Sequence, residues 1–336
     1  MNEEPGPPPP RRRLTYLDAR TGRPAEAEVV ATAGDGAVKL ETPGGTVEAR
    51  LLEPGGAGHR ALDNEIITGL RVRRCLAGRP HPAEVPALIG YDVSGDGPFA
   101  LVEPYRGSPC GAEAGRLLPE DLHRFQASLL VGVRVLTAAG IAHRALGPHT
   151  VRWDGERVQI TGFARAALLG EPREAVGVPP WSAPEQRPEQ VSGDVTDRDD
   201  LWAAGRLILY MATGEEGAEP DAAALPPELA RLVDGLFGPP GTRPDVTGML
   251  RRIEAADPVP YGPEPEPGLV EGRREFFRIR QAKHAETAPG VPDEEPGPDP
   301  GPRPGRWRMP RVSPHWAWLG VALIVLLALS AHLIGG

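Results

Sequence analysis

The chain has 336 residues and a formal net charge of −9 at pH 7, which argues against nucleic acid as its main partner. Only Cys75 and Cys110 are cysteines, so neither a disulfide framework nor a cysteine-based zinc site can form, as suits a reducing cytosol. The 41 prolines and 42 glycines crowd the first ten residues and the stretch 258–314. Between them about 240 residues remain, enough for a sizeable core.

Residues 1–13 are charged and proline-rich, without the apolar stretch of a secretory signal, and are expected to be a disordered leader. The next part, 14–105, is rich in short β-branched runs separated by glycine- and proline-containing turns. It is expected to be a small β-rich domain with a single helix over 62–76. The predicted strands are 28–32, 37–42, 46–52, 85–91 and 99–103.

From residue 106 to 256 the pattern becomes helical. Leu122, Phe125, Leu129 and Val133 recur at helical spacing after residue 117, and Gly140 supplies a stop signal. Further helices are predicted over residues 200–213, 227–237 and 244–253.

The remainder, 257–314, is a Pro/Glu/Gly-rich linker. Residues 271–286 within it are either a solvated, partly helical spacer or a short helix that docks on the domain or on a membrane surface. An uncharged apolar run over 316–334 predicts a transmembrane helix at 315–334. Four arginines lie just before it, so the positive-inside rule keeps the preceding domain in the cytoplasm. A buried core helix is the alternative.

The stretch 141–152, IAHRALGPHTVR, carries the most specific pattern in the chain. It resembles a loop that reads H-R-D-x-x-x-x-N, in which Asp accepts a hydroxyl proton and Asn holds magnesium. His143 and Arg144 keep their places, but Ala145 stands at the Asp position and Thr150 at the Asn position. Four more motifs follow in order: GFA at 162–164, APE at 183–185, TDRDDLWAAGRLILYMATG at 196–214 and GTRPDVTGML at 241–250.

In their order and spacing these motifs resemble the bacterial eukaryotic-like serine/threonine protein kinase family, over roughly residues 14–256. The resemblance implies an α+β, two-lobed protein-kinase-like fold with a β-rich N-lobe (14–105) and a helical C-lobe (106–256). It also implies a buried ion pair between Glu185 and Arg243. The residues that it implies as holding the fold are His143, Arg144, Phe163, Glu185, Asp200, Gly205 and Arg243.

The same resemblance identifies the positions that hold the catalytic, phosphate-binding and metal-binding residues in this family. In this chain, each of these positions holds a residue that does not suit that role. Arg50 occupies the place of the phosphate-binding lysine, and Val178 that of a threonine that usually bonds the catalytic aspartate. The other degenerate positions are Ala145, Gly147, Thr150 and Gly162. With the base and both metal ligands missing, we expect no phosphoryl transfer, no required cofactor and no magnesium site. No histidine or cysteine spacing predicts another metal site.

One feature favours residual nucleotide binding. The string at 34–39, GDGAVK, is similar to the loop of with-no-lysine kinases, which supply the phosphate-binding lysine from strand two. The alternative is a plain hairpin with an exposed Lys39. Possible ATP contacts are Gly34, Gly36, Lys39, Glu65 and Glu103.

The resulting hypothesis is a cytoplasmic pseudokinase, anchored in the cell membrane by one C-terminal helix. It would act as a scaffold or allosteric partner for another protein at the membrane. The alternative is an unusual active kinase, or an ATP-binding switch, that uses Lys39.

Overall fold

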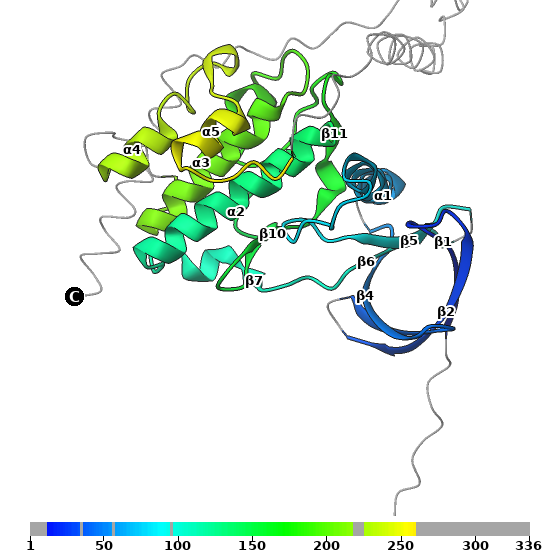
Figure 1. The fold of residues 1–336 in the computed structure, drawn as a ribbon. Helices are drawn as coiled ribbons and strands as arrows, with labels where there is room; N and C mark the ends of the chain where they lie inside the picture. The colour runs from blue at the N-terminus through cyan, green and yellow to red at the C-terminus, as the bar shows by residue number, and fades with distance from the viewer. Residues whose placement is uncertain (1–11, 34–35, 56–57, 95–96, 218–224, 260–336) are drawn as a thin grey trace, which may run out of the picture. The chain divides into compact units, whose positions relative to one another are not determined.

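The computed structural model describes residues 12–33, 36–55, 58–94, 97–217 and 225–259. Within these residues an N-terminal β-barrel is followed by a mostly helical part (Figure 1). Residues 1–11 of the predicted disordered leader and the segment 271–286 lie outside the described residues. The last two residues of that leader, Arg12 and Arg13, instead begin a strand that pairs with residues 24–32.

Six antiparallel strands form the barrel, and each pairs with a neighbour on both sides. The order around it is β1-β2-β3-β4-β6-β5, and β1 closes the ring by pairing with both β2 and β5. The five strands predicted from the sequence each overlap one of these, whereas β1 was not predicted. The bounds are β1 (Arg12–Asp18), β2 (Pro24–Thr32), β3 (Ala37–Thr42), β4 (Gly45–Leu52), β5 (Leu88–Asp92) and β6 (Phe99–Val102).

Closure of the barrel depends on alternation in β1 and on a glycine in β5. Leu14 and Tyr16 point into the barrel core and are buried, while Thr15 between them is exposed. The ring of Tyr16 lies against Gly90, where a Cβ atom would come within 2.2 Å of Tyr16 Cδ2. Any side chain at position 90 would therefore force the two closing strands apart.

The predicted fold class is wrong. In place of the small β-rich lobe of a two-lobed kinase-like fold, the N-terminal strands form a closed barrel, because β1 covers both edges that an open sheet would leave. The predicted C-terminal membrane helix also finds no support. None of the helices in the described ranges is long and apolar enough to cross a bilayer. Residues 315–334 lie outside those ranges, and the membrane localisation that depended on them stays a prediction.

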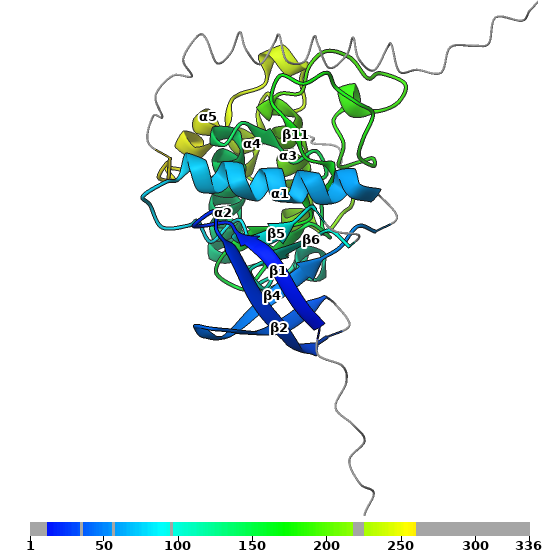
Figure 2. The same cartoon turned by 90° about the vertical axis from the view of Figure 1, so that its right-hand side faces the viewer.

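Helix α1 (Gly58–Cys75) lies between the barrel and the helical part, as two views of the molecule show (Figures 1 and 2). The helical part is built on α2 (Pro119–Ala138) and α3 (Asp197–Thr213), completed by α4 (Pro227–Val233) and α5 (Val246–Arg252). Its short strands are β7 (Ser108–Pro109), β8 (Ile141–Ala142), β9 (Val151–Trp153), β10 (Val158–Ile160) and β11 (Ala167–Leu168).

Local sequence explains where the two long helices begin and end. Helix α2 starts with proline at its first position and acidic residues in its first turn, and Gly140 follows it with a φ of 72°. Helix α3 has three aspartates in its first turn and ends at Gly214, whose φ is 77°. Glycine adopts this left-handed conformation without steric cost and so terminates a helix.

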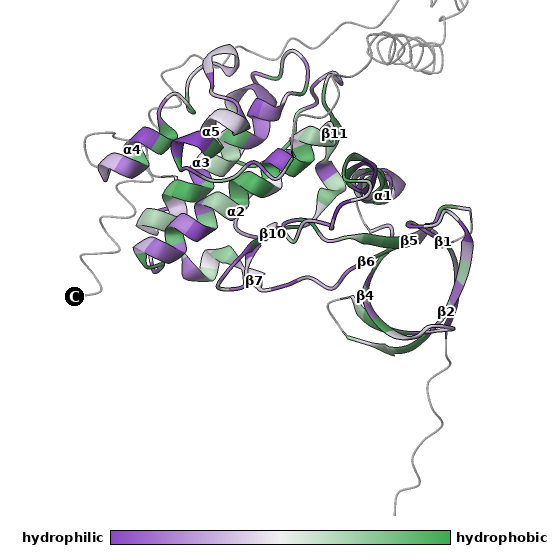
Figure 3. Cartoon of the chain, viewed as in Figure 1, coloured by the Kyte–Doolittle hydropathy of each residue, from purple (hydrophilic) through white to green (hydrophobic). Residues whose placement is uncertain are grey.

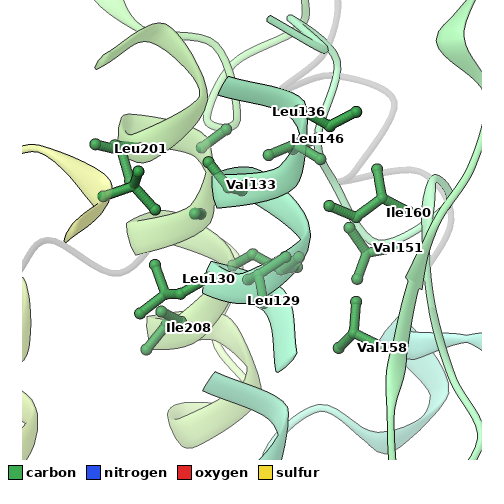
Figure 4. Packing of buried hydrophobic residues seen from close by; sticks show 14 of the residues in the cluster. Leu129, Leu130, Val133, Leu136, Leu146, Val151, Val158, Ile160, Leu201 and Ile208 are labelled. Carbon is green, nitrogen blue, oxygen red and sulfur yellow. The ribbon is translucent and has the colours of Figure 1, made fainter. Parts of the chain in front are cut away.

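The core of the helical part is centred on α2. Its apolar residues face α3 on one side and the hairpin of β9 and β10 on the other (Figure 4). Leu130 packs towards Leu201 and Ile208, and Leu129 lies towards Val158. Colouring by hydropathy shows the same pattern, with α2 largely apolar and α4 more hydrophilic (Figure 3). This core holds in place the turn between β8 and β9, where the most specific motif lies.

Candidate functional site

Asp200 of α3 supports the motif turn, residues 143–150, by accepting two of its backbone hydrogen bonds. One carboxylate oxygen of Asp200 accepts the backbone N–H of His143 at 2.6 Å, and the other accepts that of Arg144 at 2.8 Å. Arg144 has a positive φ of 65°, a strained conformation for an arginine that these bonds help to maintain. Burial raises the pKa of Asp200 to about 7, although the two N–H donors act in the opposite direction.

His143 is fully buried and fastens the turn to its neighbours. Its Nε2 lies 3.1 Å from the carbonyl oxygen of Thr161, and its Nδ1 accepts the N–H of Ala145 at 3.2 Å. Burial lowers the pKa of His143 to about 4, so the ring is neutral at pH 7. Its ring meets that of Phe163 edge to face, with centroids 5.1 Å apart. His143 therefore positions the backbone and is not exposed to a substrate.

The two positions of this turn that the resemblance marks for chemistry are held by Ala145 and Thr150. Ala145 offers only a methyl group. The hydroxyl of Thr150 donates to the carbonyl of Ala145 at 2.8 Å and accepts the N–H of Gly147 at 3.1 Å. The side chain of Thr150 therefore stabilises the turn through hydrogen bonds to the turn's own backbone. At Gly147 a Cβ atom would lie 3.6 Å from Trp181 Cγ, so the indole ring stands beside the place of the missing lysine.

Gly162 begins the next motif in a left-handed conformation, with φ 78° and ψ 64°. A Cβ atom there would meet only Thr150, at 3.5 Å, so the space of a larger side chain is open. The two residues that follow, Phe163 and Ala164, donate their N–H groups to the carboxylate of Glu65 on α1. The side chain of Asn64 donates to the carbonyl of Ala164 at 2.8 Å. Helix α1 is therefore attached directly to this motif.

Arg50, in the place of the phosphate-binding lysine, lies against Tyr105. The guanidinium carbon is 4.3 Å from the ring centroid, a cation–π contact, and Arg152 lies near the same ring at 5.8 Å. Burial, and then the charge of Glu65, raise the pKa of the Tyr105 hydroxyl. Sequence analysis did not single out Tyr105, because an aromatic residue after a strand carries no signal for such a contact.

The candidate nucleotide contacts come from separate elements of the chain. Lys39 is exposed on the outer face of β3, directly across from Glu48 of β4. Gly36 forms part of the β2–β3 turn with a φ of 86°, and Gly34 lies outside the described residues. Glu103 accepts the N–H of Ala87 at 3.2 Å, in the segment that follows β6.

The structure brings Glu185 and Arg243 together. Two parallel contacts of 2.5 and 2.9 Å join the carboxylate to the guanidinium, and both side chains are buried. Burial alone would raise the pKa of Glu185, but the hydrogen bond from Arg243, a backbone hydrogen bond and the charges of Arg243 and Arg173 together hold the pKa below its usual value. In α3, a Cβ atom at Gly205 would come within 2.9 Å of Leu236 Cδ1, so a larger side chain there would require Leu236 to shift.

Three further contacts of the segment 163–185 could not be predicted from any spacing. Arg173 and Asp199 form a buried bidentate pair at 3.0 and 2.8 Å, between residues 26 positions apart. Arg144 donates to the carbonyl of Glu174 at 2.7 Å, and the exposed Glu174 carboxylate meets Arg60 of α1 at 2.8 Å. These contacts hold the segment against the motif turn.

A cavity of about 200 Å³ lies between the motif turn and this segment. Its lining consists of residues 144–150, Arg165, Gly177, Val178, Trp181 and Ser182.

The residues present do not form a magnesium site. Within the described ranges no three His, Cys, Asp or Glu side chains gather closely enough to hold a metal ion. At the two positions that the resemblance marks for metal ligands, Gly162 has no side chain and the hydroxyl of Thr150 is engaged by the backbone.

A pH dependence follows from Glu65. Burial raises its pKa from 4.5 to about 7, so the protonated carboxyl favours the folded state. Its contribution is fully present below pH 4.5 and is lost as the pH rises through 7. The variant Glu65→Gln should flatten the dependence of the free energy of unfolding on pH in this range, as measured by urea denaturation. Glu189→Gln, at an exposed position, is the control; equal slopes for Glu65→Gln and wild type would contradict the assignment.

Comparison with known proteins agrees with the motifs. The chain is 32% identical over 158 residues to the DNA damage-responsive serine/threonine-protein kinase RqkA of Deinococcus radiodurans, covering 43% of this chain and 23% of that protein. It is 25% identical over 182 residues to the probable serine/threonine-protein kinase PkwA of Thermomonospora curvata, covering 52% of this chain and 23% of that protein.

A third relative is serine/threonine-protein kinase ppk21 of Schizosaccharomyces pombe, 29% identical over 151 residues, which cover 36% of this chain and 27% of that protein. The chain therefore spans about a quarter of the length of these three relatives. No protein-family profile matches it. The relatives confirm the resemblance read from the motifs and support a protein-kinase-like family for this chain, bacterial kinases included.

Proposed function

We propose that this protein-kinase-related chain is a pseudokinase, which binds another protein and does not transfer phosphate. The observation that carries the proposal is the hydrogen bonding of the motif turn. Where a kinase has a base and a metal ligand, this turn has a methyl group and a hydroxyl that donates to its own backbone. Phosphoryl transfer depends on positioned charges that stabilise the transferring group, and both charges are missing here.

The surroundings of Arg50 support the same proposal. An arginine in the place of the phosphate-binding lysine could still attract a phosphate, but its guanidinium lies over the Tyr105 ring at 4.3 Å. Glu65, which would orient such a cation, accepts backbone N–H groups of the following motif instead. A nucleotide would have to displace the stacking and find new partners for both groups. We therefore expect ATP to bind weakly and without dependence on magnesium.

The proposal is tested with purified full-length chain, radiolabelled ATP and either magnesium or manganese. We expect no phosphate incorporation into the protein, and at most a small rise in melting temperature with nucleotide. A ligand at a hundred times its dissociation constant would raise the free energy of unfolding by about 2.7 kcal/mol, which a melting curve detects easily.

The matched control is Lys39→Ala, which removes the only lysine that the alternative function could use. Phosphate incorporation by the wild type that Lys39→Ala abolishes would replace the pseudokinase proposal with an active kinase. A large magnesium-dependent rise in melting temperature without incorporation would favour an ATP-binding switch.

A further inference from the structure

The exposed face at the end of helix α1 carries a cluster of arginines. Arg71, Arg74 and Cys75 share this face, because residues three and four positions apart are neighbours on a helix surface. Arg79 follows in the loop after α1, and Arg134 lies on the neighbouring helix α2. No acidic residue occurs from 66 to 83, although the net charge of the chain is −9. We call the four arginines the arginine patch.

Packing of α1 against α2 brings the members of the arginine patch together. The Nε–H of Arg71 donates to the carbonyl oxygen of Ala139, just after α2, at 2.8 Å. Burial raises the pKa of the Cys75 thiol, and the charges of Arg134, Arg79 and Arg71 oppose that shift. The charged groups that act on this exposed thiol are therefore all arginines, and they come from α1, the loop after it and α2.

The fold itself uses only a part of this positive charge. Arg73 and Arg74 lie in the last turn of α1, where a cation interacts favourably with the helix dipole. Arg73 also donates to the carbonyl oxygen of Leu88 at 3.2 Å. The side chains of Arg74 and Arg79 are exposed, and within the described ranges neither forms an ion pair or a hydrogen bond. These two guanidinium groups are therefore accessible to an anion from outside the chain.

One carboxylate of the chain already lies at the edge of the arginine patch. The Nε–H of Arg134 donates to Asp257 at 2.9 Å, and a second nitrogen of Arg134 donates to the carbonyl oxygen of Val259 at 3.2 Å. This arginine thus binds an acidic side chain and a backbone carbonyl two residues further along the same segment. The contact shows the kind of group that suits the patch, namely an acidic stretch of polypeptide.

We infer that the arginine patch binds a segment of a partner protein that carries several aspartates or glutamates. The inference rests on the proposed function, because it assigns a surface to the protein binding which that function requires. A long polyanion such as nucleic acid would be repelled by the net charge of −9, whereas a short acidic segment meets only the patch. Exposed ion pairs are individually weak and are screened by salt, so binding requires several acidic residues and weakens as salt is added.

The test uses full-length chain and a rhodamine-labelled peptide, Gly-Asp-Glu-Asp-Glu-Asp-Gly, with binding followed by fluorescence anisotropy in about 50 mM salt. The amide peptide Gly-Asn-Gln-Asn-Gln-Asn-Gly is the comparison and should bind about tenfold more weakly or not at all. The double variant Arg74→Gln/Arg79→Gln should weaken binding of the acidic peptide about tenfold. The matched control is Arg20→Gln/Arg157→Gln, which removes the same charge at two exposed positions outside the patch and should leave binding nearly unchanged.

Cys75 locates the bound peptide. Its thiol is exposed, whereas Cys110 is fully buried, so a neutral reagent such as 4,4′-dithiodipyridine reacts with Cys75 first in the native protein. We expect the acidic peptide to slow this reaction several-fold, and the amide peptide to leave its rate unchanged.

Equal binding of the two peptides, absence of binding, equal losses in the two double variants, or an unchanged rate of Cys75 modification would each overturn the inference. It would also be overturned if Glu264→Gln/Glu266→Gln speeds the modification of Cys75 in the absence of peptide, since the patch would then be occupied by the chain's own acidic residues. The peptides contain no hydroxyl residue and cannot be phosphorylated, so their failure to bind leaves the absence of phosphoryl transfer standing. Phosphate incorporation in the ATP experiment would instead refute the pseudokinase proposal, whatever the peptides do.

Discussion

Replacing Glu185 with alanine is expected to lower the free energy of unfolding by about 3–5 kcal/mol, because it leaves the guanidinium of Arg243 buried without its carboxylate partner. Arg243 would keep its bond to the carbonyl of Gly238 at 2.9 Å and its position over the Trp202 ring at 4.9 Å. Neither contact neutralises the charge. For a chain of this size the loss corresponds to a fall in melting temperature on the order of 10 °C. Thermal and urea denaturation both measure it.

The matched control is Glu174→Ala, which removes an ion pair with Arg60 whose side chains are 53% and 64% exposed. Exposed pairs of this kind contribute at most about 1 kcal/mol. The pKa of Glu185 is held low, so its stabilising contribution exists above the ordinary glutamate pKa and is lost as the pH falls through the lowered value. The difference between wild type and Glu185→Ala should accordingly shrink in acid. If Glu185→Ala has the same melting temperature as wild type at neutral pH, the structure around residues 183–185 is contradicted.

The second large effect is expected at the strand that closes the barrel. Tyr16 is 7% exposed and packs with Leu14 and Val29 in the barrel core. Truncating a buried aromatic side chain to alanine typically costs about 3–5 kcal/mol, since the cavity that remains cannot collapse fully. Tyr16→Ala should therefore unfold at markedly lower urea concentration than wild type.

Leu17→Ala, on the same strand but 40% exposed, is the control and should stay within about 1 kcal/mol of wild type. The difference in stability between the two variants tests whether β1 closes the barrel or contributes little to its stability. If Tyr16→Ala is as stable as Leu17→Ala, β1 does not complete the barrel. Hydrogen exchange of the β5 amides should also quicken in Tyr16→Ala, because β5 pairs with β1 on one side.

Local patterns in the sequence were enough for many elements of this protein. Short β-branched runs between turn residues predicted five of the barrel strands, and helical spacing with a glycine stop predicted α2. The predicted helix 200–213 coincides with most of α3. The resemblance also implied the pairing of Glu185 with Arg243, and the structure shows it. These features depend on short stretches of chain, or on pairs that recur in related proteins.

Tertiary structure decided the rest. Whether the strands form an open sheet or a barrel depends on pairing of β1 with β5, strands separated by about seventy residues whose fit depends on Tyr16 resting on Gly90. The stacking of Arg50 on Tyr105 likewise arises where distant segments meet. Residue type shows which groups are missing from the motif turn. Only packing shows what occupies their surroundings, because burial and hydrogen-bond partners are properties of the assembled fold and not of the local sequence.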